Sequence, residues 1–106
     1  MERICTFVIN DKLYTIYEVD KIEGKENIVG RSHYGERSVQ IEKGSLKQML
    51  ITLKHELMHV WLYENGHINQ IDEPIFDYED LCEYVALSNN SINLIVDKYL
   101  YFKNLR

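Results

Sequence analysis

The chain contains little of what disulfide-stapled, fibrous or membrane-spanning proteins are built from. Its 106 residues include one proline, five glycines and two cysteines, and no apolar run is long enough to cross a membrane. Cys5 and Cys82 have neither the spacing of a metal-binding pair nor a disulfide framework around them, so we expect two thiols in a reducing cytoplasm. Glu2 follows Met1 directly and no sustained apolar stretch comes after it, which predicts that this segment is not a signal peptide.

Basic clusters are also missing from the sequence. The formal net charge is -5, and no run of lysine or arginine alternates with aromatic residues, so a nucleic-acid partner is not expected. Hydrophobic residues make up 45% of the chain and charged residues 27%, which are ordinary values for a soluble globular protein. The length is sufficient for one domain with a modest core, and we expect residues 1–106 to form that single domain.

Two kinds of hydrophobic pattern divide the chain near residue 44. Segments rich in β-branched and apolar residues predict strands at residues 4–9, 13–19, 28–29 and 38–41. Turns or loops are expected between them, at residues 10–11, 21–27 and 30–35. Residues 45–106 follow a mainly helical pattern. Strands followed by helices indicate an α+β fold, in which a small antiparallel sheet of three or four strands packs on a central helix and one or two C-terminal helices.

The central helix has clear start and stop signals. Ser45 is a typical N-cap, and Asn65-Gly66 is a typical C-terminal stop because glycine readily takes the left-handed conformation. Between them, apolar residues recur at steps of three and four, as an amphipathic helix requires: Leu46, Met49, Leu50, Leu53, Leu57, Val60 and Trp61. A second helical pattern begins at Asp77 or Glu79, and the polar residues 88–91 form a cap cluster. The apolar residues after them predict either a last helix or a bent continuation of the second one.

The most informative segment lies in the middle of the central helix and reads His55-Glu56-Leu57-Met58-His59. Residues four apart share a helix face and lie about 6 Å apart along its axis, so the two imidazoles can converge on one zinc ion. Glu56 lies beside that face, where its carboxylate can reach a metal-bound water without being a ligand. The alternative is a helix with two surface or core histidines and a solvated glutamate, but the largely uncharged flanks favour the metal site.

A catalytic zinc ion usually has three protein ligands and one position open to water, so a third ligand must come from elsewhere in the chain. Acidic residues open the second helical pattern, and we predict Glu79 as the ligand with Asp80 as its main rival. Glu83 is predicted to orient a ligating imidazole, although the choice of ligand among the three positions stays open. The alternative is that such acids only stabilise the first turn of a helix, and we prefer it for Asp77 and Asp80.

Two histidines outside the motif are weaker ligand candidates. His67 follows the glycine stop and His33 lies in a predicted turn, so each is more readily explained as a surface histidine. The donor to the oxyanion of a tetrahedral intermediate could be either of these imidazoles or a tyrosine, with candidates at Tyr63, Tyr78 and Tyr84.

These segments together resemble a known family. Residues 53–66, which contain the motif, and residues 79–86, which begin with the paired acids, are similar to small zincin-like metallopeptidases of phages and prophages, themselves similar to ImmA/IrrE-type proteins. The resemblance implies a minimal gluzincin in which two histidines and one glutamate bind zinc, namely His55, His59 and Glu79. It also implies a short sheet whose edge holds an extended peptide. Asp80 departs from the family pattern, in which glutamate is commoner, so the choice between positions 79 and 80 stays open.

The motif and the resemblance predict a zinc-dependent metallopeptidase, a hydrolase in which Glu56 acts as the general base on zinc-activated water. We expect a protein or peptide substrate, with a regulatory protein as one possibility, and neither a membrane nor a nucleic acid as partner. The alternative is a zinc-stabilised protein-binding or regulatory module with little or no peptidase activity, because so short a chain has little room for a lobe that closes a substrate cleft.

Overall fold

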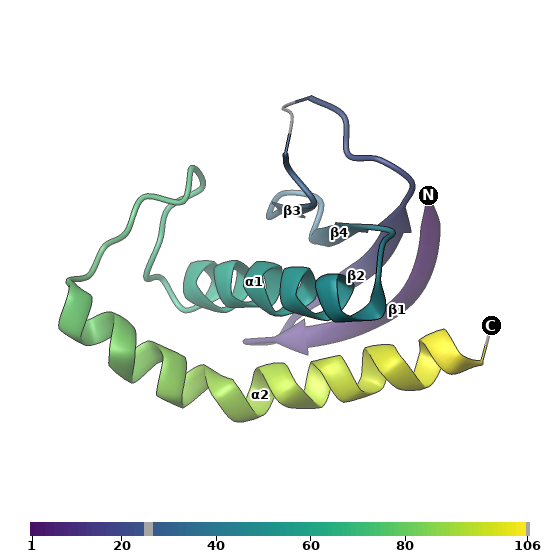
Figure 1. The fold of residues 1–106 in the computed structure, drawn as a ribbon. Coiled ribbons are helices and arrows are strands. Elements are labelled where there is room, and N and C mark those ends of the chain that lie inside the picture. The colour runs from purple at the N-terminus through teal and green to yellow at the C-terminus, as the bar shows by residue number, and fades with distance from the viewer. Residues whose placement is uncertain (25–26, 106) are drawn as a thin grey trace.

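The computed structural model describes residues 1–24 and 27–105, which form an α+β fold (Figure 1). Four strands come first and two helices follow: β1 (Glu2–Ile9), β2 (Lys12–Val19), β3 (Gly30–His33), β4 (Ser38–Glu42), α1 (Leu46–Glu64) and α2 (Tyr78–Asn104). This order confirms the predicted fold class. The predicted loop at residues 21–27 includes Lys25 and Glu26, which, like Arg106, lie outside the described residues. Within the described ranges, neither helix combines the length and apolar character needed to cross a membrane.

The sheet is mixed, and its strand order is β1-β2-β4-β3. β1 and β2 form an antiparallel hairpin whose turn residues, Asn10 and Asp11, have positive φ angles of 49° and 64°, as a two-residue hairpin loop requires. β4 pairs antiparallel to β3 but parallel to β2, whereas the sequence pattern predicts an antiparallel sheet throughout. The difference arises because the chain crosses from β2 to the far edge, forms β3 there, and turns back to place β4 between the two.

β3 lies two residues later than the sequence predicts. The apolar pair at residues 28–29 precedes the strand, and residues 30–33, expected to form a turn, pair with β4 instead. The turn itself spans residues 34–37, where Arg37 has a φ of 51°. Glycine inside a strand commonly marks a close approach by another group. At Gly30 the strand passes close to α1, since a Cβ there would lie 2.6 Å from Cγ2 of Thr52.

α1 begins and ends where the sequence predicts. The side chain of Ser45 accepts a hydrogen bond from the backbone N–H of Gln48, and Gly66 follows the C-cap Asn65 with a φ of 79°. The inner face of the helix packs on the sheet, and the fully buried side chains of this core include Leu53, Leu57 and Val60 of α1 with Tyr14, Ile16, Val39 and Ile41 of the sheet and Tyr99 of α2. Each large apolar side chain buried in this way contributes about 1.5–3 kcal/mol. The motif therefore lies on a helix that is firmly anchored in the core.

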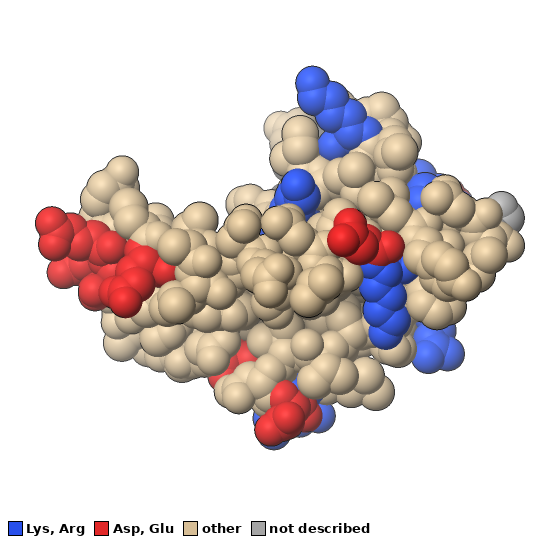
Figure 2. Space-filling view, turned by 90° about the horizontal axis from the view of Figure 1, so that it is seen from below, with Lys and Arg blue, Asp and Glu red and all other residues tan. Residues whose placement is uncertain are grey.

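α2 is one continuous helix of 27 residues. The sequence leaves open whether the helix ends at residues 88–91 or continues with a bend. Ser88 is buried there, its hydroxyl donates to the carbonyl of Val85 at 3.2 Å, and the helix continues. Near the C-terminus, the Tyr99 hydroxyl and the Lys103 ammonium group donate to Oε2 of the buried Glu18 at 2.7 and 2.8 Å. These bonds fix the second half of α2 on the sheet. Figure 2 shows acidic side chains gathered at the left end of the molecule, where α2 begins.

Candidate metal centre

The two histidines of the motif converge on one point beside α1. They lie one turn apart, and Nε2 of His55 is 3.1 Å from Nε2 of His59. Two nitrogens that are each about 2.0–2.1 Å from a tetrahedral zinc ion lie about 3.3 Å apart. His55 is exposed and His59 is half-buried, so solvent and a metal ion can reach this point. The separation, the ligand type and the access therefore fit two imidazole ligands of one zinc ion.

Glu56 is turned away from solvent and toward β3, and only 7% of the residue is exposed. The Ser32 hydroxyl lies 2.8 Å from Oε1 of Glu56, to which it donates a hydrogen bond. Residues two apart on a strand share a face, so Gly30 also faces α1, and a Cβ at Gly30 would come within 2.9 Å of Oε2. β3 thus holds one carboxylate oxygen and leaves room for the other. The sequence analysis missed both residues because it placed them in a turn, and the glycine within a strand was the available signal.

A carboxylate lies on the opposite side of the His59 ring. Oδ1 of Asp72 is 3.5 Å from Nδ1 of His59 and accepts a hydrogen bond from the Tyr34 hydroxyl. Burial and this hydrogen bond raise the pKa of Tyr34 above its ordinary value, so the phenol stays a donor. The sequence analysis assigned the orienting role to Glu83. Asp72 was missed because only the folding of the loop after α1 brings it to His59.

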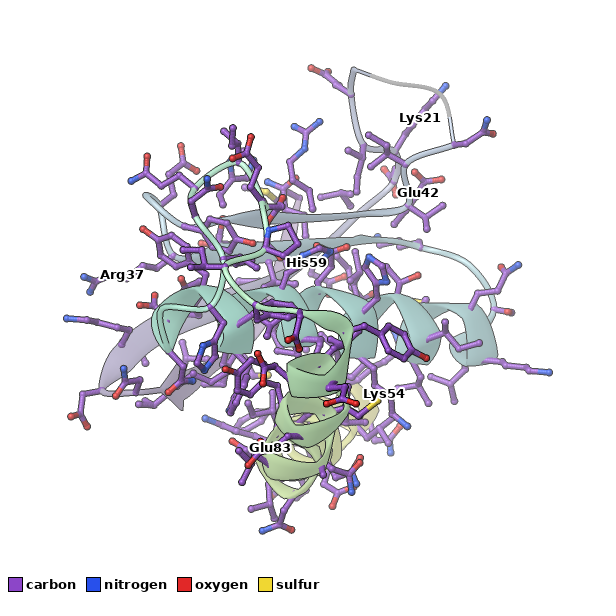
Figure 3. All side chains as sticks on the ribbon, turned by 90° about the vertical axis from the view of Figure 1, so that its left-hand side faces the viewer. Lys21, Arg37, Glu42, Lys54, His59 and Glu83 are labelled. Carbon is purple, nitrogen blue, oxygen red and sulfur yellow. The ribbon has the colours of Figure 1, made fainter. Side chains whose placement is uncertain are left out.

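The acidic residues at the start of α2 stabilise that helix. The Asp77 side chain accepts from the N–H of Asp80 at 3.0 Å, and the Asp80 side chain accepts from the N–H of Asp77 at 3.4 Å, which confirms the helix-capping interpretation of these two. Glu79 and Glu83 are exposed, and Figure 3 shows Glu83 and His59 on opposite sides of α1. Among the residues that the structure describes, no group of three histidine, cysteine, aspartate or glutamate side chains is placed to hold a metal ion. Glu79 as the third ligand therefore stays a prediction.

The other candidate side chains have aromatic or solvent surroundings. His67 stacks on Tyr84 with ring centroids 3.8 Å apart, which links the loop after α1 to the first turns of α2. Tyr63 stacks on another tyrosine, Tyr78 is 80% exposed, and His33 is the last residue of β3. The identity of an oxyanion donor among them stays a prediction.

A pocket of about 330 Å³ opens between β3 and α1 beside the motif. It is lined by residues 27–30 and by Ile51, Thr52, His55 and Glu56. Val29 and Ile51 are 50% and 60% exposed, so the pocket has apolar walls that solvent reaches. β3 is an edge strand of the sheet, which leaves one of its sides open to pairing with an extended peptide. A larger hollow of about 810 Å³, near Met1 and Arg31, contains none of the predicted site residues.

No protein-family model matches the chain, and no curated protein or solved structure matches it at a significant level. The resemblance to zincin-like metallopeptidases therefore stays a prediction, and the centre is interpreted from its own residues and geometry.

Proposed function

We propose that the chain is a zinc-dependent metallopeptidase, with His55 and His59 as metal ligands and Glu56 as the general base. The observation that carries the proposal is the 3.1 Å separation of the two Nε2 atoms, beside a glutamate that is 7% exposed. Without a cation, one of these nitrogens must carry a proton and donate it to the other, whereas two zinc ligands present both lone pairs to the ion. Both the distance and the donor type suit zinc.

Each residue of the centre has a separate role in the proposed peptide hydrolysis. When bound, zinc supplies Lewis acidity, which polarises the scissile carbonyl and allows water to lose a proton near neutral pH. Glu56 takes that proton and passes it to the leaving amine, a role that typically contributes about 10²–10⁴-fold in rate. Ser32 holds one carboxylate oxygen of Glu56 with its 2.8 Å hydrogen bond, so the second oxygen can accept the proton. The open edge of β3 would bind the substrate backbone, and the neighbouring pocket would accept a substrate side chain.

Glu79 is the proposed third ligand. Asp80, its rival, is engaged in the capping box of α2. The first buried residue of α2 is Ser88, and the turns that carry Glu79 contact the rest of the chain through Tyr84, which stacks on His67. Glu79→Gln should weaken zinc binding by about tenfold or more, whereas Asp80→Asn should mainly lower helix stability. Equal zinc affinity in Glu79→Gln and the wild type, measured by competition with a chelator, would show that Glu79 is not the ligand.

Glu56→Gln tests the proposed reaction. The amide keeps the size of the side chain and an oxygen for Ser32 but cannot take a proton from water, so cleavage should fall by about 100-fold or more while zinc is retained. Elemental analysis measures zinc per chain, and a library of internally quenched peptides measures cleavage. Glu36→Gln, an exposed site in the turn after β3, is the matched control and should behave as wild type. A wild-type protein without stoichiometric zinc, or an active Glu56→Gln variant, would contradict the proposal.

A zinc-stabilised protein-binding module is the second candidate, and exposed apolar side chains near the start of α2 favour it. Ile71, Ile75 and Tyr78 are 72%, 65% and 80% exposed, and a partner protein, including a regulatory protein, would bury them. The same variant separates the two candidates. A binding module with Glu56→Gln should still capture its partner, whereas a peptidase with that change should no longer cleave its substrate.

The two cysteines are compatible with a reducing compartment, whether the chain is a peptidase or a binding module. The cytoplasm is therefore the proposed location. Cys5 is buried and Cys82 is exposed, and the two are not joined by a disulfide.

A further inference from the structure

Asp72 lies in the loop between α1 and α2, and hydrogen bonds within the loop fix its position. The N–H of Asp72 donates to the carbonyl of Asn69 at 3.1 Å, and the N–H of Glu73 donates to the Asn69 side chain at 3.0 Å. A β-bridge between Ile68 and Pro74 closes the loop. Asp72 has a φ of 63°, in the left-handed region that aspartate, asparagine and glycine accept most readily. The loop therefore presents this side chain from a defined backbone conformation.

The side chain of Asp72 meets groups from two other parts of the chain. Its Oδ1 lies 3.5 Å from Nδ1 of His59 and accepts the hydrogen bond of Tyr34, which belongs to the turn after β3. The Tyr34 ring stacks on Tyr63, with centroids 4.1 Å apart and planes 3° from parallel. Tyr63 lies one turn of α1 beyond His59, so the phenol, the carboxylate and the imidazole are all positioned relative to the same helix.

The chemistry of a zinc-binding imidazole gives this arrangement a role. A neutral imidazole offers Nε2 to a metal ion only when its proton is on Nδ1. A carboxylate beside Nδ1 favours that tautomer and fixes the plane of the ring. Nε2 of His59 lies 3.1 Å from Nε2 of His55, and Nδ1 of His59 lies 3.5 Å from Oδ1 of Asp72, so the two ring nitrogens have the neighbours that this tautomer needs. The hydrogen bond from Tyr34 limits rotation of the Asp72 carboxylate away from the ring.

We propose that Asp72, held by Tyr34, is a positioning residue that selects the zinc-binding tautomer of His59. The inference rests on the proposed function, because only a ligand at Nε2 needs that tautomer. Asp72 takes no part in proton transfer at Glu56. Its loss should therefore act through zinc affinity and through the state of the His59 ring.

The test compares the wild type with Asp72→Ala, Tyr34→Phe and Glu73→Gln in two measurements. One is the zinc dissociation constant from competition with a fluorescent chelator, and the other is the His59 tautomer in the metal-free protein from long-range proton–nitrogen NMR correlations. Zinc affinity should fall about 10–100-fold in Asp72→Ala and by a smaller factor in Tyr34→Phe. The Nδ1–H tautomer should lose its predominance in Asp72→Ala. Glu73→Gln alters the same loop, keeps an oxygen for the bond from Asn69, and should match the wild type in both measurements.

The outcomes separate this inference from the proposed function. Asp72→Ala with zinc affinity within about twofold of the wild type and an unchanged His59 tautomer overturns the inference. A wild-type protein that binds no zinc overturns the proposed function, and the tautomer comparison on metal-free protein then still decides whether Asp72 positions His59. If circular dichroism shows that Asp72→Ala is unfolded, Tyr34→Phe carries the test because it removes only one hydroxyl, and unchanged values there count against the inference.

Discussion

Gly30→Ala should lower the stability of the chain and the activity of the candidate metal centre, although it changes neither histidine. A Cβ at position 30 would lie 2.6 Å from Cγ2 of Thr52 and 2.9 Å from Oε2 of Glu56, whereas non-bonded carbon atoms rest about 3.5–4.0 Å apart. Gly30 does not have a positive φ, so an alanine there is strained by these contacts rather than by its backbone. Thr52 is β-branched and has few χ1 rotamers on the helix, so we expect relief to come mainly from a movement of β3 by about 1 Å.

A movement of that size has two measurable consequences. It would stretch the 2.8 Å hydrogen bond from Ser32 to Glu56 beyond the usual range. Overpacking typically costs about 1–3 kcal/mol, so the free energy of unfolding in urea should fall by that amount. Misplacing a catalytic group by about 1 Å can cost about 100-fold in rate, so peptide cleavage should fall by about ten- to a hundredfold. Zinc affinity should stay close to that of the wild type, because the substitution lies against Glu56 and not against the histidines.

Gly35→Ala is the matched control, since a Cβ at Gly35 would have no neighbouring atom within 4 Å. It should stay within about 0.5 kcal/mol of the wild type. Adding Thr52→Ser to Gly30→Ala removes the nearest clashing methyl group and should restore part of the lost stability. If Gly30→Ala and Gly35→Ala unfold with equal free energies, then β3 does not approach α1 as described, and the reasoning that places Ser32 against Glu56 fails.

Two further predictions concern the pocket and alkaline pH. Ile51→Asp puts a charge into the apolar wall of the pocket and should lower kcat/KM for peptides about tenfold or more. Leu94→Asp, at a similarly exposed site on α2, is the control and should leave kcat/KM unchanged. Equal effects of the two substitutions would show that the pocket does not bind the substrate. Burial, with hydrogen bonds to carboxylates, raises the pKa of Tyr14 and Tyr99 above the ordinary value of about 10. Their contribution to stability is therefore complete below about pH 10 and falls above it by about 1.4 kcal/mol per tyrosine per pH unit, because the unfolded chain loses protons that the folded chain keeps. Urea unfolding as a function of pH measures this slope. If all eight tyrosines show phenolate absorbance while the chain is still folded, the prediction is refuted.

Much of the motif helix could be predicted from local sequence. Ser45 and Gly66 mark its ends through hydrogen bonds and backbone conformations that involve only neighbouring residues. The helical period then places His55 and His59 on one face and Glu56 beside it. By contrast, the same local reasoning could not decide between a helix end and a continuous helix at residues 88–91. Burial and a backbone hydrogen bond of Ser88 outweigh the turn preference of the polar group there.

The surroundings of the motif depend on contacts between distant parts of the chain. The parallel pairing of β2 with β4 and the position of β3 follow from long-range strand pairing, which no local pattern encodes. That pairing brings Gly30 and Ser32 to Glu56, and the fold of the loop after α1 brings Asp72 to His59. The sequence by itself therefore determined the helix and the two converging histidines, since both are consequences of the helical period. Only the tertiary structure decided which groups hold the carboxylate and orient the imidazole, because those contacts exist only when the sheet, the helix and the loop are packed together.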